Sequence, residues 1–313
     1  MVGGTGFLGY HVVGELLSRG HEVGTLARRA GAPRHPAVTA HVGDVTTLAE
    51  TARLVRGYDG VVFAAGADDR TVPPRPAYPY FAARNVAPVE QLLRAAREGG
   101  ATRAVVLGSY FTALHRSWPE SGLADRHPYI RSRVAQAAAA SAVDGLPASV
   151  LEIPFVFGAA PGIRPLWAPV LPWLRSAAPL LAPRGGTAAV SVDTVARTVA
   201  GALEQAHSGP CPVVDENLSW SRLLGRFAAA AGRPRQVRRL PSAVLRAALP
   251  AAGLGHALRG REPGLRPADL AELLTRELYL DEETCRRLGG PAGSLDEALR
   301  ETVRGCEETA RRR

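Results

Sequence analysis

The chain opens with a glycine triplet at Gly3, Gly6 and Gly9, and an amphipathic pattern over residues 7–19 follows it directly. In such a turn the first glycine permits a tight bend, the second lets the backbone approach a pyrophosphate, and the third allows close helix packing. The helix N-terminus adds free N–H groups and a positive dipole end. The pattern favours a dinucleotide-binding turn over a merely structural one. Its predicted cofactor-binding residues are Gly3, Thr5, Gly6, Phe7, Leu8 and Gly9.

Short apolar runs alternate with helical patterns through the first two thirds of the chain. We expect strands at 21–27, 38–42, 60–65, 103–108 and 148–153, and helices at 7–19, 48–55, 79–98 and 129–143. This alternation predicts an α/β fold, a Rossmann-like doubly wound parallel sheet whose ligands bind at the carboxyl ends of the strands. Only Met1 and Val2 precede the turn, whereas a central strand usually has about five or six residues. We therefore expect that translation starts upstream or that the numbered sequence is incomplete.

The regular alternation of strand and helix patterns stops after residue 158. Residues 159–186 are rich in Pro and carry Trp167 and Trp173, which favours an irregular packed segment. From 188 a strand and a helix return, with Asp193 as the expected N-cap. The predicted division is a dinucleotide-binding domain of residues 1–155 and 187–208, and a smaller, mixed substrate domain of residues 156–186 and 209–313.

All 38 residues counted as Lys or Arg are Arg. The absence of Lys excludes a Schiff-base enzyme and a P-loop nucleotidase, because both need a Lys amine. Codon bias explains the composition as a whole but leaves open what happens at any single functional position. Three widely spaced cysteines predict neither a disulfide framework nor a metal site. Without a signal peptide or a long apolar stretch, the sequence predicts a cytoplasmic protein with no membrane partner.

The net charge of +9 is unevenly distributed. Between Glu216 and Glu262 there is no acidic residue, and there are nine arginines: Arg222, Arg226, Arg233, Arg235, Arg238, Arg239, Arg246, Arg259 and Arg261. A solvated basic face and a pocket for an anionic substrate both fit this stretch. Nucleic acid is not an expected partner, because no known nucleic-acid-binding motif accompanies the charge.

The order of several motifs resembles the extended short-chain dehydrogenase/reductase family, the NAD(P)-dependent epimerase/dehydratase group. The segments that carry the resemblance are the opening glycine turn, Gly43-Asp44-Val45, the run from Asp59 to Gly66, Asn85-Val86, and Val192-Asp193 with the segment from Val214 to Trp220. The resemblance implies a fold, a small-molecule substrate and further cofactor contacts. Those contacts would be Asp44, Val45, Ala64, Ala65, Gly66, Asn85, Arg133, Pro154 and Phe155.

The family's chemistry uses Ser, Tyr and Lys. Tyr handles the proton at a hydroxyl or carbonyl, Ser hydrogen-bonds the same oxygen, and Lys holds the nicotinamide ribose. The resemblance assigns Ser109 and Tyr129 to the first two roles, and it places Arg133 where the family has Lys. A spacing of four puts Tyr129 and Arg133 one helical turn apart on the same face. A second departure is Glu152, where many relatives have Arg.

Arg133 leaves three possibilities open, because Arg and Lys are not interchangeable at such a position. The first is a working redox site, that is, an oxidoreductase or an epimerase/dehydratase acting on a nucleotide sugar or a secondary metabolite. The second is altered chemistry such as isomerisation or cyclisation, and the third is a non-catalytic dinucleotide sensor. An Arg133 side chain that faces the cofactor favours catalysis, and one that pairs with an acid opposes it.

The residues at the end of the second predicted strand bear on the choice of cofactor. NAD enzymes commonly carry an acidic residue there, whereas NADP enzymes use Arg for the 2′-phosphate. Arg28 and Arg29 therefore favour NADP(H) over NAD(H). The resemblance further implies a homodimer through the helices 79–98 and 129–143, and the Ala-rich run 135–142 would allow them to pack closely.

Overall fold

The larger of the two main sheets is parallel. The computed structural model describes residues 1–28 and 35–311. The strand order is β2-β1-β3-β4-β5-β9, and Val2 lies between β1 and β3, bridging Leu26 on one side and Phe63 on the other. The strands are β1 (Gly24–Ala27), β2 (Thr39–Val42), β3 (Gly60–Phe63), β4 (Arg103–Leu107), β5 (Ala148–Glu152) and β9 (Gly209–Pro212).

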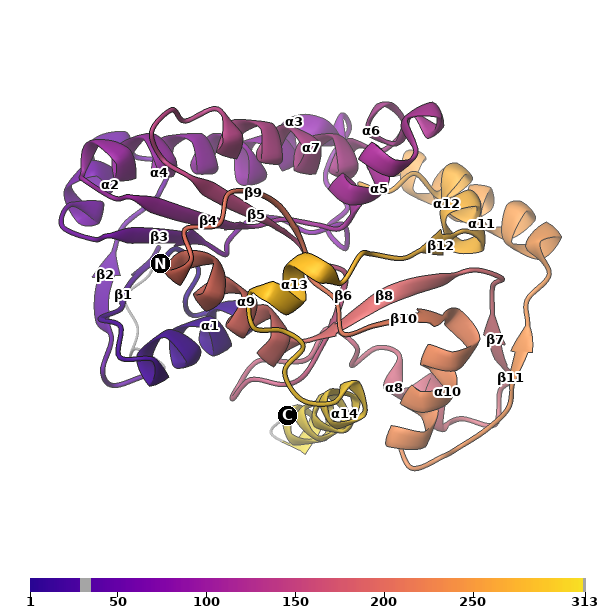
Figure 1. The fold of residues 1–313 in the computed structure, drawn as a ribbon. Helices are drawn as coiled ribbons and strands as arrows, with labels where there is room; N and C mark the ends of the chain where they lie inside the picture. The colour runs from indigo at the N-terminus through magenta and orange to yellow at the C-terminus, as the bar shows by residue number, and fades with distance from the viewer. Residues whose placement is uncertain (29–34, 312–313) are drawn as a thin grey trace.

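Helices cover both faces of this sheet (Figure 1). On one face lie α1 (Phe7–Ser18) and α9 (Val192–Glu204), and on the other lie α2 (Leu48–Val55), α3 (Ala77–Asn85), α4 (Ala87–Glu98) and α7 (Pro128–Ser141). The sheet is apolar on both faces, with Val105 and Leu151 in the core beneath α1 and α9, and Val106 and Val150 in the core beneath α4. Two buried faces are what an uninterrupted apolar strand requires. The predicted doubly wound α/β fold is confirmed.

The second sheet is smaller and mixed. Its central strand β8 pairs with antiparallel β10 and with parallel β12 and β6, while β7 and β11 form a separate two-stranded ribbon. These strands are β6 (Phe155–Phe157), β7 (Leu180–Ala182), β8 (Gly186–Ser191), β10 (Glu216–Ser219), β11 (Val237–Arg239) and β12 (Glu277–Leu278). The accompanying helices are α8 (Leu171–Arg175), α10 (Trp220–Ala230), α11 (Ser242–Ala257), α12 (Pro267–Thr275), α13 (Glu283–Arg287) and α14 (Leu295–Arg311).

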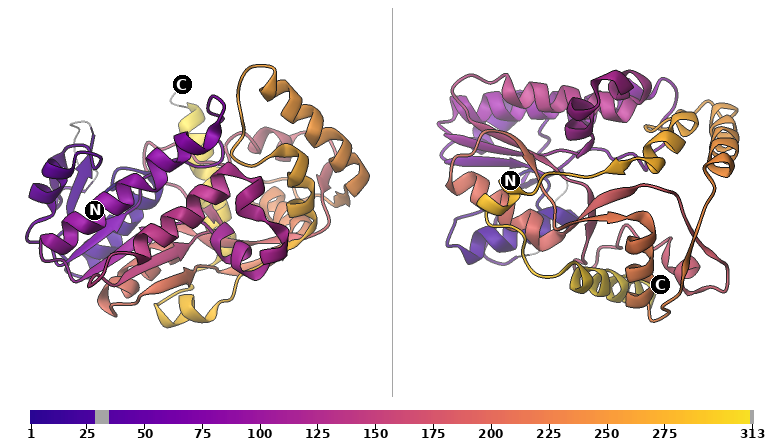
Figure 2. Two further views of the ribbon diagram at one scale, coloured as in Figure 1. Left: turned by 90° about the horizontal axis from the view of Figure 1, so that it is seen from above. Right: turned by 45° about the vertical axis from the view of Figure 1, so that its right-hand side comes forward.

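Two strands lie in the opposite sheet from the one that the predicted division implies. β8 was assigned with the dinucleotide-binding part, but it is the centre of the second sheet. β9 was assigned with the substrate part, but it extends the parallel sheet beside β5. The chain therefore crosses between the two parts at other places than the predicted division implies, because β8 and the helix that follows it, α9, belong to different layers (Figures 1 and 2).

Three local predictions were wrong. The helix expected over 79–98 is two helices that meet at Val86, because Pro88 lacks an N–H and its ring disfavours a continuous turn. The N-cap of α9 is Ser191, whose hydroxyl accepts a hydrogen bond from the Thr194 N–H at 3.2 Å, and Asp193 lies in the first turn. The segment 159–186, expected to be irregular, contains α8 and β7.

Three shorter helical segments link β4 to α7: α5 (Phe111–Ser117), a 3₁₀ turn at Pro119–Ser121, and α6 (Leu123–Arg126). Within the described ranges, no helix combines the length and the apolar character needed to cross a membrane.

Candidate active site

A cavity of about 650 Å³ lies at the carboxyl ends of β3, β4 and β5, where the parallel sheet meets the second part of the chain. This is where a doubly wound sheet binds its ligands. Eleven of the predicted site residues line it: Gly6, Phe7, Leu8, Ala64, Ala65, Gly66, Ser109, Tyr129, Arg133, Pro154 and Phe155.

The glycine turn brings its backbone directly to the cavity wall. Gly3 has a φ of +85°, and its carbonyl accepts a hydrogen bond from the Gly6 N–H at 3.0 Å. A Cβ on Gly9 would collide with that same carbonyl oxygen, so only glycine allows α1 to begin so close to the turn. Gly6 is the N-cap of α1 and brings no capping side chain. Gly3, Thr5 and Gly9 shape the turn without lining the cavity, and the arrangement fits a diphosphate held by backbone N–H groups.

The residues predicted for the adenosine end lie outside this cavity. Arg28 is exposed directly after β1, and Arg29 falls outside the described residues. Asp44 accepts hydrogen bonds from the Thr46 N–H at 2.9 Å and the Thr46 hydroxyl at 2.8 Å. These bonds, and then the nearby charge of Arg28, lower the pKa of the Asp44 carboxyl. Val45 is half-buried after β2, and its carbonyl accepts from the Thr51 hydroxyl at 3.2 Å.

Arg133 faces the cavity and contacts Tyr129. Its Nε donates to the Tyr129 hydroxyl at 3.1 Å, while its two terminal nitrogens donate to the Gln136 side-chain oxygen at 2.9 Å and to the Ala67 carbonyl at 3.1 Å. Both Tyr129 and Arg133 are buried, at 5% and 8% exposure. Three hydrogen bonds in three directions fix the guanidinium, and within the described residues it forms no ion pair. Arg133 therefore does not turn away toward an acid.

Ser109 follows β4 and is buried on the same cavity wall. Asn85, predicted as a cofactor contact, does not line the cavity. Its side-chain oxygen accepts from the Ala67 N–H at 2.8 Å and its nitrogen donates to the Ser132 hydroxyl at 3.1 Å. Asn85 thus ties the loop after β3 to α7, and it positions the residues that do face the cavity.

Sequence reasoning missed several polar residues of the cavity, among them Asp69 and Tyr110. Burial, and then the charge of Asp68, raise the pKa of the Asp69 carboxyl, which the charges of Arg70 and Arg133 oppose. Burial strongly raises the pKa of the Tyr110 phenol. Both follow strands at their carboxyl ends, and that position was the available signal.

Glu152, the second departure from the family pattern, forms an ion pair. It is 1% exposed, and its carboxylate accepts from both terminal nitrogens of Arg116, at 2.6 and 2.8 Å. The Thr112 hydroxyl donates to it at 2.6 Å. The acid at this position is thus a structural partner for α5, which follows Ser109.

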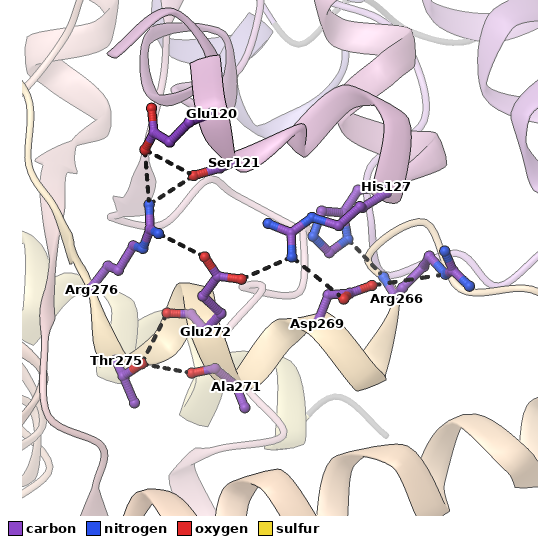
Figure 3. A network of polar contacts seen from close by, with 10 residues as sticks. Glu120, Ser121, His127, Arg266, Asp269, Ala271, Glu272, Thr275 and Arg276 are labelled. Atoms are coloured by element: carbon purple, nitrogen blue, oxygen red, sulfur yellow. Dashed lines mark hydrogen bonds and ion pairs between the residues drawn. The ribbon is translucent and has the colours of Figure 1, made fainter. Parts of the chain in front are cut away.

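Hydrogen bonds and ion pairs join the segment 264–276 to the start of α7, the helix that carries Tyr129 and Arg133 (Figure 3). The Tyr129 N–H donates to the Gly264 carbonyl at 2.9 Å, and the Arg266 N–H donates to His127 Nδ1 at 3.0 Å. Around these bonds, Arg126 pairs with Glu272 at 2.8 Å, and Glu272 pairs in turn with Arg276 at 2.7 Å. Burial lowers the pKa of His127 to about 4.

The arginines between Glu216 and Glu262 do not line the cavity. Arg226 pairs with Glu216 and Asp296, both at 2.6 Å. Arg235 donates to four backbone carbonyls at the end of α8 and just beyond it. The charged side chains that do line the cavity are Asp68, Asp69, Arg70 and Arg133.

The parallel-sheet part of the chain matches a known family. Residues 3–151 match the model of an NAD(P)H-binding family. These residues form an NAD(P)H-binding domain. It contains the glycine turn, β1 to β5 and all three residues of the Ser, Tyr and Arg set, so the predicted dinucleotide cofactor is confirmed at the level of NAD(P).

One curated relative is similar to a short part of the chain, and solved structures extend the comparison beyond the NAD(P)H-binding domain. A 3-beta-hydroxysteroid dehydrogenase of Mycolicibacterium neoaurum is 40% identical over 70 residues, which are 22% of this chain and 19% of that protein. The crystal structure of gox2253 shares the fold with a TM-score of 0.79 and 20% identity, over 99% of this chain and 98% of that one.

Two further structures are named as epimerases. Human epimerase family protein SDR39U1 with NADPH is 19% identical with a TM-score of 0.69, over 97% of this chain and 98% of that one. The UDP-N-acetylglucosamine 4-epimerase from Bacillus cereus is 17% identical with a TM-score of 0.67, over 96% of this chain and 93% of that one. At these identities the likeness establishes the fold, which is the one that the resemblance to extended short-chain dehydrogenases/reductases predicts.

Proposed function

We propose that the protein is an NAD(P)-dependent oxidoreductase of the extended short-chain type, acting on a hydroxyl or carbonyl group of a small molecule. The observation that carries the proposal is the contact between Arg133 Nε and the Tyr129 hydroxyl, on the wall of the cavity that the glycine turn also reaches. When bound, the nicotinamide supplies the hydride. The chain then has to position the substrate oxygen and to move a proton.

Tyr129 holds that proton at its hydroxyl, within the cavity. Arg133 orients the hydroxyl through a charge-assisted hydrogen bond and keeps a fixed positive charge beside the oxygen that loses the proton. Ser109, on the same wall, would hydrogen-bond the substrate oxygen. Gln136 and Ala67 hold the guanidinium in place, so Arg133 supplies charge and orientation without the mobility of a Lys amine.

We further propose that the substrate is apolar. Away from the loop after β3 and from Arg133, the cavity wall is mostly aromatic and aliphatic, with Trp167, Trp220, Leu270, Leu273 and Leu274 among its side chains. The charged side chains of the cavity lie in the loop after β3 and at Arg133. A nucleotide sugar carries two phosphates, and the basic stretch that could neutralise them lies elsewhere. The local likeness to a 3-beta-hydroxysteroid dehydrogenase agrees with an apolar alcohol or ketone.

Purified protein with NADP(H) or NAD(H) tests both proposals, with a 3-beta-hydroxysteroid, smaller cyclic ketones and UDP-sugars as substrates. We expect oxidation or reduction of the nicotinamide with the cyclic alcohols or ketones. Tyr129→Phe should lower turnover about 100-fold or more, because it removes general acid–base catalysis, and cofactor affinity should stay nearly unchanged. Tyr78→Phe is the matched control, because Tyr78 lies outside the cavity and its ring packs on Arg131. Turnover of UDP-sugars alone would refute the apolar substrate, and undiminished turnover by Tyr129→Phe would refute the mechanism.

We also propose a preference for NADP(H), assembly as a homodimer and a cytoplasmic location. Arg28, exposed at the end of β1, supports NADP(H), and Arg28→Glu should shift the preference toward NAD(H). A homodimer through α3, α4 and α7 is expected from the resemblance, and sedimentation equilibrium tests it. The three cysteines are buried free thiols, which agrees with a cytoplasmic location.

The rival function is a dinucleotide sensor without catalysis. It predicts cofactor binding with no redox turnover across the same substrates. The position of Arg133 favours the enzyme, because the guanidinium donates to the phenol that would carry the proton.

A further inference from the structure

One helix of the second part, α11, exposes an apolar face to solvent. Val244, Leu254 and Leu258 are 50%, 61% and 80% exposed. Their spacing places them on one side of the helix, and Ala247 and Ala251 continue the same side. No charged side chain interrupts this stripe, since Arg246 is the one charged residue of α11 and lies off it. Exposed apolar surfaces of this kind mark interaction sites in natural proteins.

The opposite side of α11 packs on the protein. Leu245 is buried, and Gly253 lies against the Pro267 ring at the start of α12. The two helices form a pair at the outer edge of the molecule (Figures 1 and 2). α12 contributes Leu270, Leu273 and Leu274 to the cavity, so it lies between the cavity and α11.

Positive charge flanks the apolar face at both ends. Arg238 and Arg239 are exposed shortly before α11, Arg246 is exposed in its first turns, and Arg259 and Arg261 are exposed just after it. No acidic residue occurs from 217 to 261. Arg226 and Arg235 are held by other groups, but these five remain at the surface and pair with no acid among the described residues.

An apolar helix face with arginines around it and no acids matches the chemistry of an anionic lipid surface. A second copy of the chain is a weaker match, because it would bring two basic surfaces together. We propose that α11 docks the protein on the surface of an anionic membrane, with the stripe Val244, Ala247, Ala251, Leu254 and Leu258 at the level of the lipid headgroups. The helix lies on the membrane and does not cross it, in agreement with the absence of a spanning helix in the described residues.

This docking is independent of the proposed reaction. It would place the α11–α12 pair, and therefore the apolar side of the cavity, toward a phase in which apolar molecules dissolve. The binding itself needs neither cofactor nor turnover, so the two proposals fail separately.

Co-sedimentation of the full chain with vesicles tests the proposal. We expect binding to phosphatidylcholine vesicles that contain phosphatidylserine, weak binding to phosphatidylcholine alone, and a loss of binding as salt is raised. The double variant Leu254→Gln/Leu258→Gln should bind the phosphatidylserine vesicles at least about tenfold more weakly, because it removes two leucine side chains from the lipid. Val42→Gln is the matched control, since Val42 is also exposed, at 52%, but lies on β2 of the parallel sheet.

A second pair of variants separates charge from apolar contact. Arg246→Gln/Arg259→Gln should weaken binding to the phosphatidylserine vesicles and leave the thermal unfolding midpoint unchanged, because both side chains are exposed. Absence of vesicle binding by the wild-type protein would overturn the proposal, and so would equal binding by Leu254→Gln/Leu258→Gln. If that variant instead converts a dimer to a monomer in sedimentation equilibrium, the face is an interface between copies and the lipid proposal is wrong.

Discussion

His127 joins the start of α7 to the segment that follows residue 263, and its protonation should therefore weaken the fold. His127 is fully buried, and its Nδ1 accepts the Arg266 N–H, so the neutral ring carries its proton on Nε2. Nε2 is buried without a hydrogen-bond partner among the described residues. A second proton would have to bind at Nδ1. The Nδ1–H group would then face the Arg266 N–H, and the hydrogen bond between them would be lost.

The size of the effect follows from the pKa of His127. This pKa is lowered from 6.5 to about 4, mainly by burial; the charges of Asp269 and Glu272 oppose the shift, and those of Arg126 and Arg266 add to it. Each pKa unit corresponds to about 1.4 kcal/mol, so neutral His127 contributes about 3 kcal/mol of stability. Because the folded state binds the proton less tightly than the unfolded state, this contribution is complete above about pH 6.5 and is lost as pH falls toward about 4.

Urea unfolding at a series of pH values measures the loss. His127→Asn keeps an acceptor for the Arg266 N–H but removes the titrating ring, so its free energy of unfolding should fall by about 3 kcal/mol less than that of the wild type over this range. His256→Asn is the control, because the His256 side chain is partly exposed on α11 and makes no hydrogen bond or ion pair among the described residues, so this variant should be as acid-sensitive as the wild type. Equal acid sensitivity of His127→Asn and the wild type would refute the assignment.

Three further variants test other parts of the structure. Gly9→Ala should abolish cofactor binding in a fluorescence titration, because its Cβ collides with the turn, whereas Gly225→Ala, with room for a Cβ, should bind normally. Glu152→Gln should lower the free energy of unfolding by about 1 to 3 kcal/mol, measured by urea titration, because it breaks an ion pair with one buried partner. Arg133→Met should reduce turnover about 100-fold or more, while Arg131→Met, exposed on the same helix, should retain turnover in the same assay. An active Arg133→Met would remove Arg133 from the proposed mechanism.

Much of the parallel-sheet part was predictable because its signals are local. The glycine turn leads straight into α1, and each apolar run that predicts a strand forms one in the sheet. Tyr129 and Arg133 are one turn apart, so the spacing alone brings them together. Eleven predicted residues line one cavity because the carboxyl ends of parallel strands converge there.

The misplaced strand β8 and the contacts that sequence reasoning missed depend on long-range pairing. The sequence around β8 resembles another βα unit, but the strand pairs with β6, β10 and β12 instead of β5. The hydrogen bond at the start of α7 joins His127 to Arg266, which are 139 residues apart, and no periodicity in the sequence predicts this contact. The apolar wall of the cavity comes from α12 and Trp220, whose leucines and ring look like ordinary core residues in the sequence.

Transfer of isotope from the cofactor tests the central claim most directly. With NADPH that carries deuterium at both positions of nicotinamide C4 and an apolar cyclic ketone, mass spectrometry of the product alcohol should find deuterium on the former carbonyl carbon. The wild-type protein and Tyr78→Phe should transfer the label, and Tyr129→Phe with saturating cofactor should form labelled product about 100-fold more slowly or less. Product that carries no deuterium, or equal labelling by Tyr129→Phe, would contradict a hydride-transfer site built on Ser109, Tyr129 and Arg133.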